Sequence, residues 1–188
     1  MRSFFVCGRG LRLFFIGERT MNKKTKLLAH GALIAAMYVA LTYMQNFLIP
    51  HSTSMMIQFR ASEALCVLAY FTPAAIPGLT AGCLLFNISS SGAMLLDVVV
   101  GSFATLLAAV GMYLSRSITV KGYPLPGMFL PAVCNGLLVG WELDYYFGGG
   151  FWLKALYVAI GEAAVLLTLG SGLYYGLKSR GLDRRLFQ

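Results

Sequence analysis

Six apolar stretches, separated by short polar segments, run through the chain from residue 27 to residue 177. A helix that crosses a membrane needs about 20 mostly apolar residues, and most of the stretches approach that length. The second and third are shorter and meet at Pro73 and Pro77 without a polar loop, so they form either one broken hairpin or two unusually tilted helices. The pattern predicts an all-α integral membrane protein, a six-helix bundle with helices near residues 27–48, 61–71, 74–87, 94–114, 126–142 and 152–177.

The composition agrees with this prediction. Hydrophobic residues make up 58% of the 188 residues and charged residues only 12%, and the mean hydropathy is +0.72. A soluble domain of this size would need a far more polar surface. The chain is long enough for six spans joined by short loops, but it leaves no room for a sizeable soluble domain.

The net charge of +8 comes from basic residues that gather in three places, which indicates membrane orientation better than nucleic-acid binding. Loops rich in lysine and arginine stay on the cytoplasmic side. We therefore expect a multi-pass protein of the cell membrane with both termini and the loop at 115–123 in the cytoplasm. The basic residues are Arg2, Arg9, Arg12, Arg19, Lys23, Lys24 and Lys26 before the first span, Arg116 and Lys121 in the loop, and Lys178, Arg180, Arg184 and Arg185 after the last span.

Residues 1–20 differ from the rest of the chain. Their apolar runs are too short for the core of a signal peptide, and Met21 opens an ordinary-looking start, M-N-K-K-T-K. We interpret residues 1–20 as a basic extension, either disordered or placed before the true start, and residues 21–188 as a transmembrane substrate-binding domain.

Small residues recur at a spacing of four, which lets helix backbones approach closely in a membrane. Ala32, Ala36 and Ala40 form a stripe on the first span, which we interpret as a docking face for another membrane protein. Three glycine pairs have the same spacing, and we expect them to pack helices inside the bundle. These pairs are Gly78/Gly82, Gly136/Gly140 and Gly172/Gly176.

Acidic and amide side chains lie in or at the ends of the spans, mostly in the halves expected to face outward. A charge at membrane depth costs about 2.5–3.5 kcal/mol on insertion scales, so each such group needs a partner or a function. Together with nearby aromatic residues they predict a pocket that opens outward and suits a flat heterocycle rich in N–H donors. The predicted binding residues are Arg60, Glu63, Asn87, Asp97, Asn135, Glu142 and Glu162.

Structural explanations remain open for most of these residues. Arg60 and Glu63 share a helix face and form an ion pair in one interpretation, while Asp97 favours a helix N-terminus. In the structural interpretation of Asn87, this residue forms the C-cap of its helix. In that of Glu142, the side chain lies at the membrane interface. Glu162 lies midway through the last span, where no such explanation applies.

Two segments resemble a known family. They are Gln58–Asn87, with the elements R-A-S-E and T-P-A-A-I-P-G-L, and Leu96–Ala109, L-D-V-V-V-G-S-F-A-T-L-L-A-A. Both are similar to the QueT family of queuosine-precursor transporters, the substrate-binding S components of energy-coupling-factor (ECF) transporters. The similarity covers the chain from about Met21 to its C-terminus, and the basic extension departs from the family pattern.

The resemblance implies a six-helix bundle that binds a 7-deazapurine such as preQ1 or preQ0 from outside, without a cofactor. The bundle then topples in the membrane to release it inward, driven by a transmembrane coupling subunit and two ATPase subunits. The alanine stripe resembles the surface that contacts the coupling subunit. Glu162 or Glu63 is then expected at the base edge of the ligand, with Asn87, Asn135, Asp97 and Glu142 as supporting contacts.

Other function classes are weaker. A stand-alone secondary transporter, proton-coupled through Glu162 or Asp97, is the main alternative. An enzyme is disfavoured because the sequence has no G-x-S-x-G motif and neither histidine lies deep in a span. The cysteines have no metal-ligand spacing, and the chain has no phosphate-binding loop of its own. A scaffold without transport activity would leave the acidic pocket without a purpose.

Overall fold

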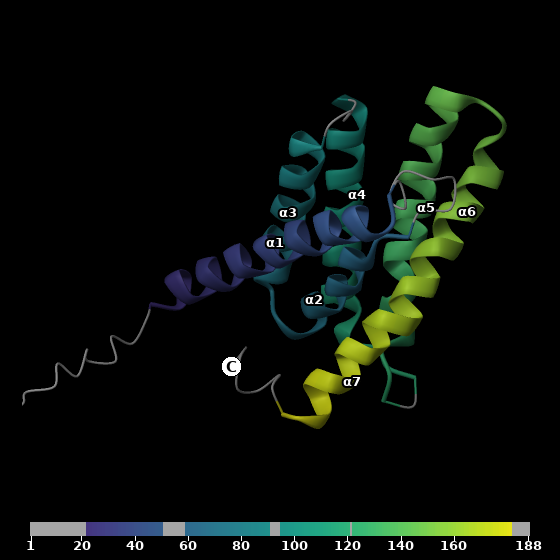
Figure 1. The fold of residues 1–188 in the computed structure, drawn as a ribbon. Coiled ribbons are helices and arrows are strands. Elements are labelled where there is room, and N and C mark those ends of the chain that lie inside the picture. The colour runs from purple at the N-terminus through teal and green to yellow at the C-terminus, as the bar shows by residue number, and fades with distance from the viewer. Residues whose placement is uncertain (1–21, 51–58, 91–94, 121, 182–188) are drawn as a thin grey trace, which may run out of the picture.

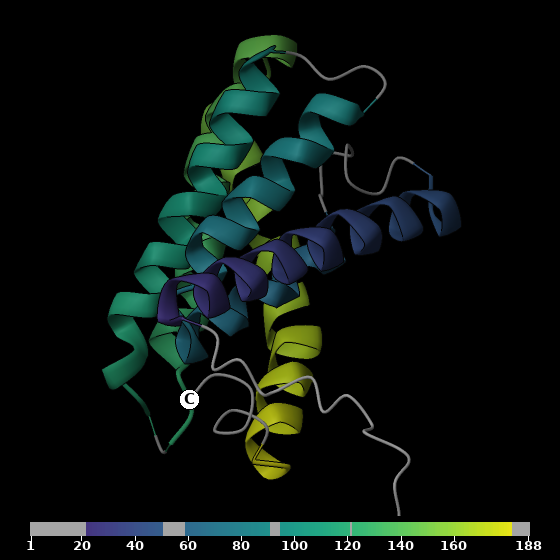
Figure 2. The ribbon, with the colours of Figure 1, turned by 90° about the vertical axis from the view of Figure 1, so that its left-hand side faces the viewer.

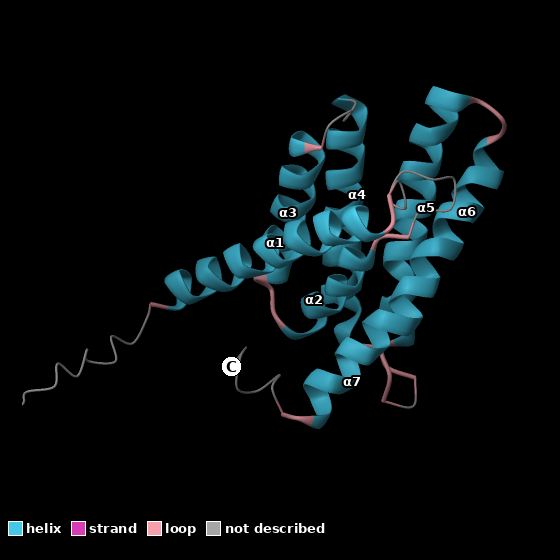
Figure 3. Cartoon of the chain, viewed as in Figure 1, coloured by secondary structure: helices cyan, strands magenta, loops and turns pink. Residues whose placement is uncertain are grey.

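The computed structural model describes residues 22–50, 59–90, 95–120 and 122–181. Every helix or strand assigned in this part of the chain is a helix, which confirms the all-α prediction there (Figure 3). The basic extension at 1–20 and Lys121 lie outside the described residues. The elements are α1 (Lys23–Leu48), η1 (Ala61–Val67), α2 (Leu68–Phe71), α3 (Ala75–Ser89), α4 (Leu95–Leu114), η2 (Ser115–Ser117), α5 (Leu125–Phe147), α6 (Phe151–Val165), η3 (Leu166–Gly170) and α7 (Ser171–Ser179).

The helices follow the six predicted stretches closely. Three continuous helical segments are long and apolar enough to cross a membrane, at Lys23–Leu48, Leu95–Ser117 and Phe151–Ser179. The two stretches that looked short are short, because Ala61–Phe71 and Ala75–Ser89 have 11 and 15 residues. They are separate helices with a break between them, as in the broken-hairpin interpretation.

Local sequence explains the helix boundaries. The side chain of Asn22 caps α1 by accepting from the backbone N–H of Lys24. α2 ends at Phe71, and the next residue, Thr72, is extended (φ −143°, ψ 135°) because Pro73 follows. α5 and α6 are joined by Gly148, Gly149 and Gly150, whose φ angles of 59°, 98° and 107° favour glycine.

The helices α3, α4, α5 and α6 stand side by side in chain order, and α1 lies across α3 (Figures 1 and 2). α3 packs on α4, α4 on α5, and α5 on α6. The end of α3 and the start of α4 lie at one end of the molecule, as do the end of α5 and the start of α6; the end of α4 and the start of α5 lie at the other end together with α7. α1 packs obliquely across α3. The alternation of these ends agrees with the expected order of outer and inner loops.

The short helical segment η1 lies at the centre of the molecule. It contacts α1, α4, α5, α6, η3 and α7, and residues 62–69 are all buried. The last long helix bulges into a π-helix, η3, beside η1, where Gly170 leaves room for Val67: an added Cβ would lie 3.1 Å from the Val67 Cγ2 atom. The second predicted span is therefore a short buried helix that other helices surround.

Two of the three glycine pairs pack helices together as predicted. An added Cβ at Gly78 would lie 2.6 Å from the Gly31 carbonyl oxygen of α1, and one at Gly140 would lie 2.6 Å from the Ala155 Cα of α6. The prediction is wrong for Gly172 and Gly176, because an added Cβ at either position meets no atom within 4 Å. This pair lies on an exposed face of α7.

Candidate functional site

Glu63 anchors a hydrogen-bonded network between α1 and η1. The Tyr38 hydroxyl donates to Glu63 Oε1 at 2.5 Å, and the Cys66 thiol donates to Glu63 Oε2 at 3.2 Å. The Thr42 hydroxyl, one turn after Tyr38, donates to the Tyr38 carbonyl oxygen at 2.7 Å and hydrogen-bonds with the Ser62 hydroxyl at 2.8 Å. We call these five residues the Glu63 network. All five are buried, and both carboxylate oxygens of Glu63 have a donor.

Three further charged side chains are buried but lack a partner for one atom each. They are Arg60 at Nε, Glu142 at Oε2 and Glu162 at Oε2, and the exposed fractions of these residues are 7%, 3% and 2%. We call them the unpartnered cluster. A buried polar atom without a hydrogen bond destabilises the protein by about 1–3 kcal/mol, and more when it is charged. Such atoms need an explanation, and a ligand is one.

The three members of the unpartnered cluster come from different elements and influence one another electrically. Arg60 immediately precedes η1, Glu142 is near the end of α5, and Glu162 is on α6. Arg60 lies within electrostatic range of both Glu142 and Glu162. The guanidinium therefore lies where it attracts both carboxylates, although its Nε hydrogen-bonds to neither.

Asn135 and Asp97 lie beside the cluster. Asn135 is buried on α5 and lies within interaction range of the Glu162 side chain. Asp97 is half-buried in the first turn of α4, within electrostatic range of Glu142. This position is also the one that favours a carboxylate at a helix N-terminus, so the capping interpretation of Asp97 stays open.

Asn87 joins two helices and does not end its own. Its Nδ2 donates to the Asp97 carbonyl oxygen of α4 at 3.1 Å, and α3 continues to Ser89. Gly101 makes the contact possible, because an added Cβ would lie 2.9 Å from Asn87 Nδ2. The interpretation of Asn87 as a helix C-cap is wrong.

Carboxyl groups outnumber cations in the described interior. Glu63, Glu142 and Glu162 are buried, as are Arg60 and Lys154. Lys154, however, donates to the Leu143 carbonyl oxygen at 2.7 Å and lies 5.5 Å from the ring of Phe147. Arg60 is thus the buried cation that acts on Glu142 and Glu162, and uncompensated charge at this depth is unfavourable.

The structure gathers the residues that the sequence singled out, and it adds others. Six of the seven predicted residues are buried and Asp97 is half-buried. Sequence reasoning missed the members of the Glu63 network other than Glu63 itself, and also Ser102, whose buried hydroxyl has no partner. The signal for Tyr38 and Thr42 was their spacing of four on the buried face of α1. The residues missed are Tyr38, Thr42, Ser62, Cys66 and Ser102.

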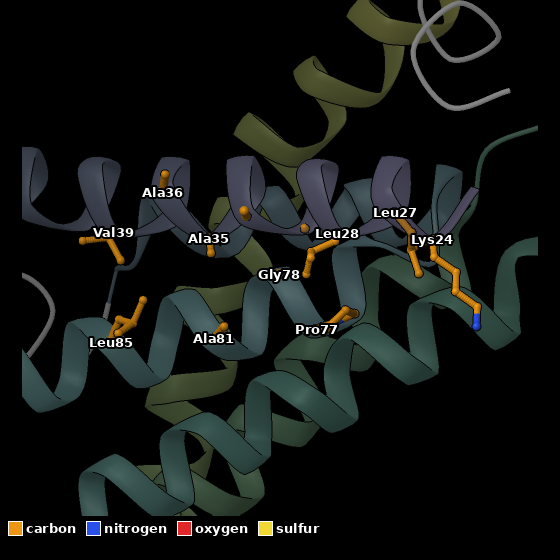
Figure 4. Close-up of a pocket in the computed structure, with 12 residues that line it drawn as sticks. Lys24, Leu27, Leu28, Ala35, Ala36, Val39, Pro77, Gly78, Ala81 and Leu85 are labelled. Atoms are coloured by element: carbon orange, nitrogen blue, oxygen red, sulfur yellow. The ribbon is translucent and has the colours of Figure 1, made fainter. Parts of the chain in front are cut away.

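The alanine stripe lies on the outside of α1, since Ala32, Ala36 and Ala40 are all exposed. Beside it runs an apolar groove of about 820 Å³ between α1 and α3. Figure 4 shows Leu28 and Ala36 of α1 together with Pro77 and Leu85 of α3 along this groove, and Lys24 at one end. The groove contains no member of the unpartnered cluster.

Comparison with known proteins gives a family. The sequence model of the QueT transporter matches residues 28–179, which include every described helix from the first turns of α1 to the end of α7. The comparisons with curated proteins and with solved structures find no match. The QueT family consists of transporters and not of enzymes, and with three apolar helices long enough to span a bilayer it indicates a membrane location. The match covers most of the chain, and the protein therefore belongs to the QueT transporter family.

Proposed function

We propose that this protein is the substrate-binding S component of an ECF importer, and that it binds a 7-deazapurine such as preQ1 or preQ0 from the outer side of the cell membrane. The observation that carries the proposal is the unpartnered cluster, in which Arg60, Glu142 and Glu162 are buried and each has one atom without a partner. Family membership supplies the transport role.

The chemistry of the ligand matches these atoms. A guanine-like edge offers N1–H and amino donors to a carboxylate, and its carbonyl oxygen accepts from a guanidinium N–H. Glu162, held by Asn135, is the acceptor that we assign to the donor edge. Arg60 Nε is the donor that we assign to the carbonyl oxygen. Asn87 and Asp97 are supporting contacts in this assignment, whereas the Glu63 network holds the start of η1 against α1.

The partner surface in this proposal is α1. Ala32, Ala36 and Ala40 present small exposed side chains to which a helix of the transmembrane coupling subunit can approach closely. The change Ala36→Leu should prevent co-purification with the coupling subunit and its two ATPases, whereas ligand binding by the isolated protein stays unchanged. Gly172→Leu, which adds the same bulk on the exposed face of α7 where nothing lies within 4 Å, is the matched control.

Residues 21–188 form the transmembrane substrate-binding domain in this proposal. The α3–α4 and α5–α6 connections face outward, and both termini and the basic loop between α4 and α5 face the cytoplasm. The support for this topology is the distribution of lysine and arginine and the common end of the molecule that the two outer connections share.

Thermal-shift screening of the detergent-purified protein tests the substrate class. A 7-deazapurine should raise the melting temperature by mass action, because it binds the folded state alone. Riboflavin and thiamine, which other vitamin transporters handle, serve as controls and should leave it unchanged. A shift with a control vitamin, or none with any deazapurine, would reject the proposed substrate.

A proton-coupled secondary transporter is the second candidate, favoured by the same buried carboxyl groups, since intramembrane acids also serve as proton relays. Uptake in a host without coupling-factor ATPases separates the two functions. The ECF proposal predicts no uptake in this host. It predicts that uptake appears when the coupling subunit and both ATPases are supplied.

A further inference from the structure

The unpartnered cluster has two acceptor positions at different heights along α5. Asn135 of α5 lies beside Glu162 of α6 and so marks its level. Glu142 lies seven residues later on nearly the same face of the helix, which is a rise of about 10.5 Å. Each carboxylate has one buried oxygen without a partner. A fused two-ring ligand with a hydrogen bond at each end spans such a separation.

The third buried carboxylate, Glu63, differs from the other two because both of its oxygens already have a donor within the protein. Both oxygens of Glu63 already accept from side chains of the protein, Tyr38 and Cys66. Glu63 thus positions the start of η1 against α1, and Arg60 with it. Glu142 and Glu162 are the buried carboxylates of the described chain that retain a free acceptor oxygen.

The negative charge at the two acceptor positions exceeds the positive charge around them. Among the described residues, Arg60 is the buried cation within range of both Glu142 and Glu162, while half-buried Asp97 adds a further negative group beside Glu142. Buried Glu63 also lies within range of Arg60 and Glu162. Three buried carboxylates therefore share one guanidinium, and Glu142 also has Asp97 as an acidic neighbour. A positive charge on the ligand, placed at Glu142, would compensate this excess.

We propose that Glu142 selects for a positively charged substituent on the ligand, while Glu162 accepts from the donor edge at its other end. The inference rests on the proposed function and narrows its substrate class to cationic deazaguanines. In preQ1 the carbonyl oxygen lies between the donor edge and the aminomethyl cation. This order matches the protein groups, because Arg60, assigned to the carbonyl oxygen, lies within range of both Glu162 and Glu142. In preQ0 a neutral nitrile takes the place of the aminomethyl group.

Calorimetric titration of the full-length purified protein with these two ligands tests the inference. Wild type should bind preQ1 at least about tenfold more tightly than preQ0, since a charge-assisted hydrogen bond exceeds a neutral one by that margin. Glu142→Gln keeps the size of the side chain and should reduce the ratio of the two affinities to within about twofold. Glu162→Gln, the matched control, should weaken both ligands and leave their ratio near the wild-type value.

Three outcomes decide against the inference, and they differ in meaning. Equal affinity of wild type for preQ1 and preQ0 would overturn selection for a cation. A ratio that survives in Glu142→Gln, with its melting temperature unchanged, would overturn the assignment to Glu142. Binding of neither ligand by wild type would reject the proposed function itself, and this inference with it.

Discussion

The two polar regions of the interior are built from similar side chains but differ in how far their hydrogen bonds are satisfied. In the Glu63 network, both carboxylate oxygens of Glu63 have partners within the protein, and so do the hydroxyl groups of Tyr38 and Thr42. In the unpartnered cluster, Arg60, Glu142 and Glu162 each bury an atom with none. One region holds α1 against η1, whereas the other contributes little to stability as it stands.

The difference separates structural from functional polarity. A buried polar group that is fully bonded rigidifies its surroundings, and one that is half-bonded is a liability unless something else binds it. Burial alone would have ranked Glu63 and Glu162 together, since both are almost inaccessible. Their partners distinguish them, and mutations in the two regions should therefore affect different measurements.

Loss of Glu63 should give the largest change in stability. Glu63→Ala leaves the Tyr38 hydroxyl and the Cys66 thiol without an acceptor in the core, which should destabilise the protein by about 3 kcal/mol or more. Thermal unfolding in detergent measures the change. Tyr38→Phe removes one donor only and should have a smaller effect. If Glu63→Ala kept the wild-type melting temperature, the Glu63 network would not stabilise the fold, and its contrast with the unpartnered cluster would be wrong.

The packing of α1 on α3 sharpens the comparison, since it holds Tyr38 in place. In Gly78→Ala the added Cβ would lie 2.6 Å from the Gly31 carbonyl oxygen, so the helices must separate. Overpacking of this kind typically destabilises by about 1–3 kcal/mol. Gly172→Ala on α7 adds the same methyl group where nothing lies within 4 Å, and its melting temperature should not fall. Equal effects of the two changes would contradict the packing described for α1.

A substitution of Thr42, at the edge of the Glu63 network, should give the smallest change in stability. Thr42→Val keeps the shape of the side chain but removes the hydroxyl that hydrogen-bonds with Ser62. One hydrogen bond of this kind contributes about 1 kcal/mol, and Ser62 lies at the periphery of the network. A small drop in melting temperature with unchanged ligand affinity is expected. Lost affinity with no change in stability would instead move Thr42 into the binding region.

The sequence predicted the helices and most of the polar residues well, because both depend on local patterns. Apolar runs and prolines gave the boundaries of α1 and α3 to within a few residues. Glu162 was identified because an acid midway through an apolar helix has no local explanation. The match to the QueT family confirms the resemblance carried by the R-A-S-E and T-P-A-A-I-P-G-L elements.

What the sequence did not predict depends on contacts between distant elements. Nothing local indicates that Tyr38 of α1 bonds to Glu63 of η1, 25 residues later. For the same reason the sequence left an Arg60–Glu63 ion pair open as one interpretation, whereas Glu63 accepts from Tyr38 and Cys66. The three glycine pairs have one spacing, yet two face a helix and Gly172/Gly176 faces open space. Spacing gives the face of a helix, and the fold decides what covers it.

The central claim is that the unpartnered cluster binds the ligand and is not needed for folding. Its most direct test is calorimetric titration of purified wild type and Glu162→Gln with preQ1, together with their melting temperatures without ligand. We predict a loss of affinity of about 10- to 100-fold, equivalent to one charged hydrogen bond, and a melting temperature that does not fall. Unchanged affinity would remove Glu162 from the site, and a destabilised variant would make it part of the structural framework.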